Sequence, residues 1–182
     1  MSYKRWIFIA IFLFGIGLVF GLVTPTSSIN LLSEDITALE EFIDILVPFE
    51  FLTVILILIK NALSLVLSFA LSPIFCLIPI LALVVNGWLL AFISAIIIQE
   101  ESLGFVLAGL LPHGIFELPA FILGEAAALS FGAMAILALF KKERRNLLLP
   151  SLKQNLRYLM VALVLLVPAA IIEIYITPLL LT

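Results

Sequence analysis

The sequence predicts an all-α, polytopic membrane helix bundle with about five transmembrane helices, a broken or re-entrant helix and an outer amphipathic helix. Of the 182 residues, 65% are hydrophobic and only 12% are charged, with a mean hydropathy of +1.37. A soluble domain is nearer half apolar and about a quarter charged. The charged residues are also confined mostly to short segments between long apolar ones. We therefore predict that residues 1–182 form a single transmembrane domain.

The distribution of charge predicts the orientation of the chain. Eight of the nine basic residues lie at 4–5 and 141–157, and eight of the twelve acids lie at 34–50 and 100–101. Because basic segments remain in the cytoplasm, we expect a multi-pass protein of the cell membrane with a cytoplasmic N-terminus and an outer C-terminus. Topology and contact with anionic lipids explain the basic segment 141–157, so no nucleic-acid partner is predicted.

Residues 6–23 form the first predicted span. They carry no charge, are too long for the apolar region of a signal peptide, and lack a small-residue cleavage site. Gly17 and Gly21 are spaced so that another helix can approach closely. Packing within the monomer is the favoured interpretation of this pair, and formation of a homo-oligomer is the alternative.

An amphipathic helix is expected between this span and the next, lying on the outer surface. Ser33 is the expected N-cap, acids follow it, and the helix ends near Pro48. Apolar residues recur between them at helical spacing, namely Ile36, Leu39, Phe42, Ile43 and Leu46.

Two further spans follow, at 49–71 and 74–98, joined by a tight turn at Ser72-Pro73. The first is interrupted at its middle by Lys60, which we expect to pair with Glu117 or Glu173. The last span covers residues 158–176. Cys76 is the single cysteine, so no intramolecular disulfide can form.

The fourth apolar segment, 104–140, is longer than one span requires. As a straight helix it would extend about 55 Å, whereas the hydrocarbon core is about 30 Å thick. We therefore expect a break at 112–119, near its two prolines and Gly114. Backbone groups freed at membrane depth must be satisfied by other protein or by a wet cavity, and transporters build binding sites in this way.

A buried polar site is predicted around this break. Ionisable residues at membrane depth are costly and usually mark a functional site. If the segment is helical, the lone His113 and Glu117 lie on one face. The predicted site comprises Asn61, Asn86, His113, Glu117 and Glu173.

Three interpretations of this site remain open. It can be a hydrogen-bonded pair that fixes helix packing, a metal site, or a path for a proton or a substrate. Zinc normally takes three or four protein ligands. A divalent metal such as zinc would be bound by His113, Glu117 and Glu173, with Glu125 and Asn86 as further candidates.

Four segments together resemble the stage II sporulation protein M family from about residue 50 onward. They are Lys60-Asn61, Asn86-Gly87, Pro112-His113-Gly114-x-x-Glu117-Leu118-Pro119-Ala120, and Glu173-x-x-x-Thr177-Pro178. The chain departs from the family's pattern at Ala62 and at Glu125. The resemblance implies a multi-pass membrane fold, with other membrane or envelope proteins as partners beside the lipid bilayer. The family's namesake is implied to hold cell-wall-degrading proteins at the membrane.

These observations favour a membrane scaffold or assembly partner. The alternatives are an intramembrane metal- or proton-binding site serving transport of a small solute, and a metal-dependent intramembrane hydrolase. No second histidine supports the hydrolase. The phosphate-binding, zinc-protease and serine-hydrolase motifs are also missing from the sequence, so the sequence argues against an enzyme.

Overall fold

The structure is a computed structural model that describes residues 3–25 and 48–181. Five long helices account for most of these residues: α1 (Tyr3–Val23), α3 (Phe51–Leu71), α4 (Leu77–Glu100), α5 (Leu103–Phe140) and α6 (Leu148–Tyr175). The 3₁₀-helix η2 (Lys142–Leu147) joins α5 to α6, and the short helix α7 (Thr177–Leu180) follows α6. All five long helices are apolar enough to cross a membrane. The predicted all-α membrane bundle is therefore confirmed, while the amphipathic helix expected after Ser33 lies outside the described residues.

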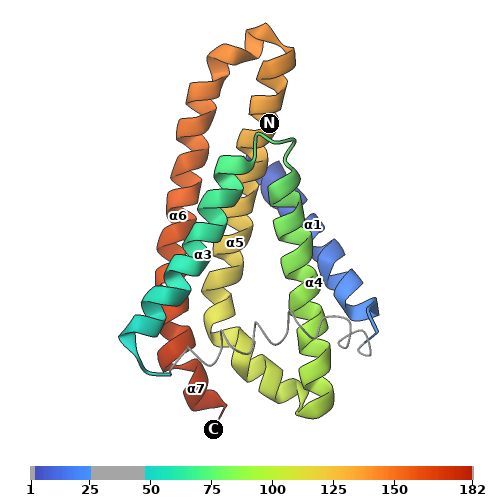
Figure 1. Ribbon diagram of the computed structural model, residues 1–182, viewed down its shortest axis with the longest axis vertical. Helices are drawn as coiled ribbons and strands as arrows, with labels where there is room; N and C mark the ends of the chain where they lie inside the picture. Colours follow the sequence, from blue (N-terminus) through green and yellow to red (C-terminus); the bar gives the residue numbers. More distant parts are fainter. Residues whose placement is uncertain (1–2, 26–47, 182) are drawn as a thin grey trace.

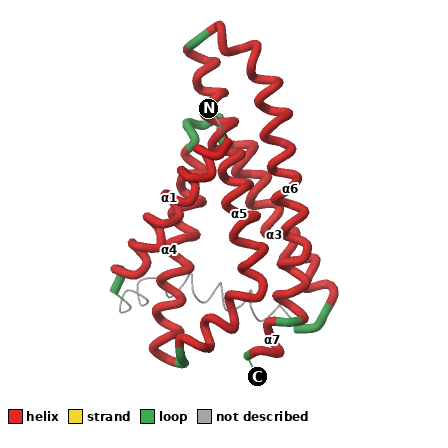
Figure 2. Tube along the Cα trace, turned by 180° about the vertical axis from the view of Figure 1, so that it is seen from behind, coloured by secondary structure: helices red, strands yellow, loops and turns green. Residues whose placement is uncertain are grey.

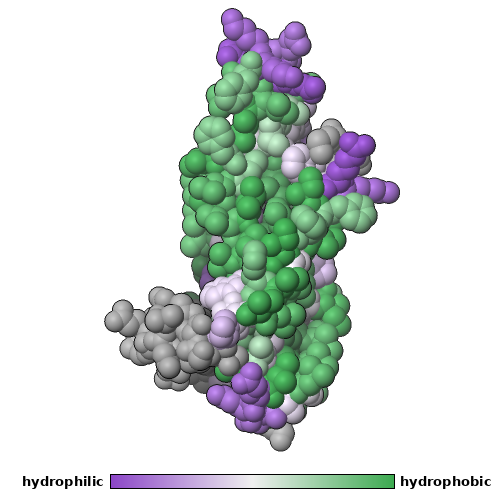
Figure 3. All heavy atoms as spheres, turned by 90° about the vertical axis from the view of Figure 1, so that its right-hand side faces the viewer, coloured by the Kyte–Doolittle hydropathy of each residue, from purple (hydrophilic) through white to green (hydrophobic). Residues whose placement is uncertain are grey.

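Helix α5 is the centre of the bundle. It lies between α1 and α4 on one side and α3 and α6 on the other, and it contacts all four (Figures 1 and 2). Its antiparallel partner α6 starts ten residues before the predicted span, so the α5–η2–α6 hairpin projects beyond the turn between α3 and α4 (Figure 1). Hydrophilic side chains gather over η2 and at the opposite end, with a broad hydrophobic surface between them (Figure 3).

The expectation of a broken or re-entrant helix at 112–119 is wrong, because the helix bends there without being interrupted. Helix α5 is continuous from Leu103 to Phe140 with Pro112 and Pro119 inside it, and its first part lies obliquely to the rest (Figure 1). Each proline removes one backbone donor, and its ring presses on the carbonyl of the residue four positions earlier. That is enough to bend the helix, while the neighbouring helical hydrogen bonds hold it together. The oblique first part also lets a helix too long for one span fit the bundle.

Helices α1 and α4 pack backbone against backbone. A Cβ atom at Gly17 or Gly21 would overlap the backbone of α4 at Val84 or Trp88, and one at Gly87 would overlap the backbone of α1 at Phe14. Small residues between membrane helices commonly let the two backbones approach this closely. The glycine pair of α1 therefore packs within the chain, in keeping with the favoured interpretation.

Candidate functional site

A cavity of about 630 Å³ lies in the wedge between α3 and α4, with α5 forming much of its wall. The two helices meet at the turn of residues 72–76 and diverge from it (Figure 1). Most of the lining is apolar. Six polar side chains also line the cavity: Lys60, Asn61, Ser64, Asn86, His113 and Glu117.

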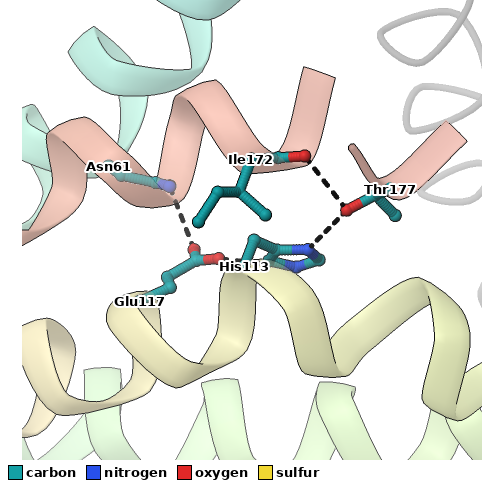
Figure 4. A network of polar contacts seen from close by, with 5 residues as sticks. All are labelled: Asn61, His113, Glu117, Ile172 and Thr177. Carbon is teal, nitrogen blue, oxygen red and sulfur yellow. Dashed lines mark hydrogen bonds and ion pairs between the residues drawn. The ribbon is translucent and has the colours of Figure 1, made fainter. Parts of the chain in front are cut away.

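The ring of His113 is oriented by Thr177, the first residue of α7. Its Nδ1 lies 3.4 Å from Thr177 Oγ1, and the Thr177 hydroxyl donates to the carbonyl of Ile172 at 3.3 Å (Figure 4). A hydroxyl has a single proton, and here that proton is directed to Ile172. With its proton so directed, the oxygen accepts a hydrogen bond from His113 Nδ1–H in the tautomer that carries the proton on Nδ1. In that neutral tautomer the lone pair lies on Nε2.

This lone pair faces the carboxylate of Glu117. Nε2 of His113 lies 3.7 Å from Oε2 of Glu117, which is too far for a hydrogen bond. The other oxygen, Oε1, accepts a hydrogen bond from Nδ2 of Asn61 at 3.0 Å (Figure 4). Helix α3 thus holds one oxygen of Glu117 and leaves the second directed at the histidine.

Glu173 completes a cluster of three. One ligand atom from each of His113, Glu117 and Glu173 lies within 4.8 Å of the other two. Glu117 repels Glu173 electrostatically, while Lys60 attracts it. The structure therefore brings together the three residues proposed as metal ligands from the sequence, and it places Lys60 where it attracts Glu173.

Asn86 stands apart from this cluster. Its side chain donates to the carbonyl of Ala82 in its own helix at 2.7 Å, and it is exposed at the cavity wall. An amide that bonds the preceding turn needs no partner on another helix. Asn86 therefore lines the same cavity as His113 and Glu117, but it is exposed and does not belong to the cluster.

Glu125, a further candidate ligand from the sequence, lies outside the cluster of His113, Glu117 and Glu173. It is fully buried, and its Oε2 accepts a hydrogen bond from Ser68 at 2.5 Å. Within the described part of the chain, its Oε1 has no hydrogen-bond partner. Glu125 lies eight residues after Glu117, about 12 Å along the helix. The sequence contains a signal for the second pair. Ser68 follows Asn61 by seven residues on α3, and Glu125 follows Glu117 by eight on α5, so the two helices can form two polar contacts two turns apart.

The cluster offers donor atoms suited to a divalent cation. Imidazole nitrogen and carboxylate oxygen are common zinc ligands, and zinc sites with three protein ligands leave a fourth position open. Two atoms bound at about 2.0–2.1 Å to one tetrahedral ion lie about 3.3–3.4 Å apart. The 3.7 Å between His113 Nε2 and Glu117 Oε2 is close to that separation. At 13% and 31% exposed, both side chains can be reached from the cavity.

Comparisons with known proteins give a family and a relative. The model of the family described as stage II sporulation protein M matches residues 9–178. An uncharacterized protein of the archaeon Methanocaldococcus jannaschii is 32% identical over 173 residues, which cover 94% of this chain and 93% of the relative. No solved structure gives a significant match. The chain is therefore a membrane protein that belongs to the stage II sporulation protein M family.

Proposed function

We propose that this protein binds one divalent metal ion, zinc by its donor set, at His113, Glu117 and Glu173. The observation that carries the proposal is the convergence of three ligand atoms from α5 and α6 within 4.8 Å. The hydrogen bond to Thr177 supports it, because a histidine that binds metal usually donates its other ring N–H to a protein oxygen. With Nδ1 directed at Thr177, Nε2 is the nitrogen that faces Glu117.

Electrostatics also favour a cation at this position. Charged groups at membrane depth are expensive unless they are paired. Two carboxylates lie near each other here, and Glu117 repels Glu173. Lys60 offsets one of the two negative charges, and a divalent ion between the carboxylates would more than offset the other. A zinc ion held by three protein ligands would keep a fourth position open, and because His113 and Glu117 line the cavity, this would suit a site that binds a solute.

Elemental analysis of the purified protein tests this function. We expect about one zinc per chain in the wild type and none in Glu117→Gln, because the amide is a poor zinc ligand. Glu125→Gln is the matched control, since it changes the other acid of α5 and leaves the cluster intact. Equal zinc contents in the two variants, or no metal in the wild type, would contradict the proposal.

A scaffold or assembly partner is the second candidate function. It is favoured by the α5–η2–α6 hairpin, which projects beyond the other helices and carries exposed basic residues at its tip (Figures 1 and 3). Such a surface can dock another membrane or envelope protein. A scaffold needs no metal, so a stable wild-type protein without bound metal would favour this second function.

We further propose that the N-terminus and η2 face the cytoplasm and that the C-terminus faces outward, in keeping with the positive-inside rule. Single cysteines introduced into a Cys76→Ser background test this orientation. A membrane-impermeant maleimide should label a cysteine at Glu101 from outside intact cells. A cysteine at Asn146 should react only after the cells are opened, and the reverse pattern would invert the topology.

A further inference from the structure

We infer that the cavity binds a single-chain amphiphile whose anionic head group, a carboxylate or a phosphate monoester, occupies the open position of the metal. The inference rests on the proposed metal site and names the class of ligand that it serves. Three properties of the described cavity support it: the arrangement of its lining, its position and the charge at its polar end.

The lining divides into a polar part and an apolar part. Asn61 and His113 both contact Glu117 in Figure 4, and Lys60 precedes Asn61 on α3. The turns of α5 before His113 contribute only apolar side chains to the cavity, among them Leu107 and Leu110. The volume of about 630 Å³ falls within the range of about 300–1,000 Å³ that small-molecule sites occupy. This division matches a ligand with a polar head and an apolar chain.

The position of the cavity favours a ligand that arrives from the membrane. It lies between two helices that diverge from their turn, and both helices carry exposed apolar side chains along their length. Exposed apolar side chains on membrane helices face lipid. An amphiphile already in the bilayer can therefore reach the wedge without crossing water.

The charge at the polar end favours an anion. Glu117, Glu173, Lys60 and a divalent ion together leave one net positive charge and one open coordination position. An anionic oxygen would both balance the positive charge and fill the coordination position. A neutral head group would only fill the position, and a cationic head group would be repelled. The apolar chain gains little by leaving lipid for a leucine-lined cavity, because lipid tails are equally apolar. The head group must therefore determine selectivity.

The test compares amphiphiles that share a sixteen-carbon chain, here palmitate, hexadecyl phosphate, hexadecanol and hexadecyltrimethylammonium. Each is titrated against the zinc-loaded protein in neutral detergent, and binding is measured by native mass spectrometry. We expect one of the two anions to bind at least about tenfold more tightly than hexadecanol, as expected for a charge contact screened from water. Which anion binds more tightly distinguishes a fatty acid from a lipid phosphate. Chelation of zinc should remove the preference.

Two tryptophan variants locate the binding. Ser64→Trp fills the cavity from α3 and should abolish binding of the anion while zinc remains. Leu67→Trp, also on α3 but exposed and away from the cavity lining, should leave binding unchanged. If all four amphiphiles bind the zinc-loaded protein equally, or if Ser64→Trp binds normally, this inference fails and the metal site stands. If the wild type holds no metal, both fail.

Discussion

His113→Ala is expected to lower the affinity for zinc at least about 100-fold, and Thr177→Val to lower it about 10- to 100-fold. Alanine removes the only nitrogen ligand of the cluster. Valine keeps the shape of Thr177 but cannot accept the hydrogen bond from Nδ1–H, and loss of such a partner of a ligand typically costs about 10- to 100-fold in metal affinity. Competition with a fluorescent zinc chelator measures both affinities on the purified protein.

The relative loss of zinc affinity in these two variants distinguishes a metal site from a structural pair. If His113 and Glu117 only fixed helix packing, both variants would lower thermal stability without changing zinc affinity. An effect of Thr177→Val as large as that of His113→Ala, accompanied by loss of helix content, would mean that α7 supports the fold and not the ligand.

Gly17→Leu is expected to destabilise the bundle strongly, by roughly 3 kcal/mol or more. The new side chain would enter the backbone of α4 at Val84, and backbone cannot move aside as the end of a side chain can. Overpacking a close contact typically costs about 1–3 kcal/mol, and here the whole α1–α4 interface must separate. Unfolding in mixed micelles, followed by circular dichroism, measures the change.

Gly15→Leu is the matched control for this substitution. Gly15 lies on the same helix, two residues earlier, and nothing lies within 4 Å of the position its Cβ would take. The same change of residue should therefore shift stability by no more than about 0.5 kcal/mol, as for most surface substitutions. Equal destabilisation by both variants would show that α1 does not pack on α4 through Gly17.

The spans could be predicted from the sequence because apolar length is the dominant constraint on a chain in a bilayer. The start of α4 was less predictable. The turn before it uses positive φ at Phe75 and Cys76, so the helix begins at Leu77 and not at residue 74. Whether α5 would break or only bend could not be predicted from the sequence alone. Two prolines weaken a helix, but the packing of its neighbours determines whether it bends or unwinds.

The candidate site was partly predictable for a similar reason. The helical period places His113 and Glu117 on one face, and the cost of a buried charge singles out Glu173. The tautomer of His113 could not be predicted, because it depends on Thr177 reaching back across the end of α6. The partner of Asn86 could not be predicted either. An amide side chain in a span can bond another helix or its own helix, and Asn86 donates to a carbonyl of its own helix. Only tertiary structure shows which one is used.

Glu125 was a candidate ligand by sequence, but it lies outside the cluster. It has no charged neighbour in the sequence, yet α3 supplies Ser68 to one of its oxygens at complete burial. Its separation from the cluster makes it the best internal reference for every substitution at Glu117.

X-ray absorption at the zinc edge of the purified protein tests the central claim most directly. We predict a first shell of nitrogen and oxygen atoms at about 2.0–2.1 Å, including one imidazole whose scattering disappears in His113→Ala. A shell containing sulfur at about 2.3 Å would instead point to Cys76. A shell without imidazole, or one unchanged in His113→Ala, would place the metal elsewhere and contradict the site.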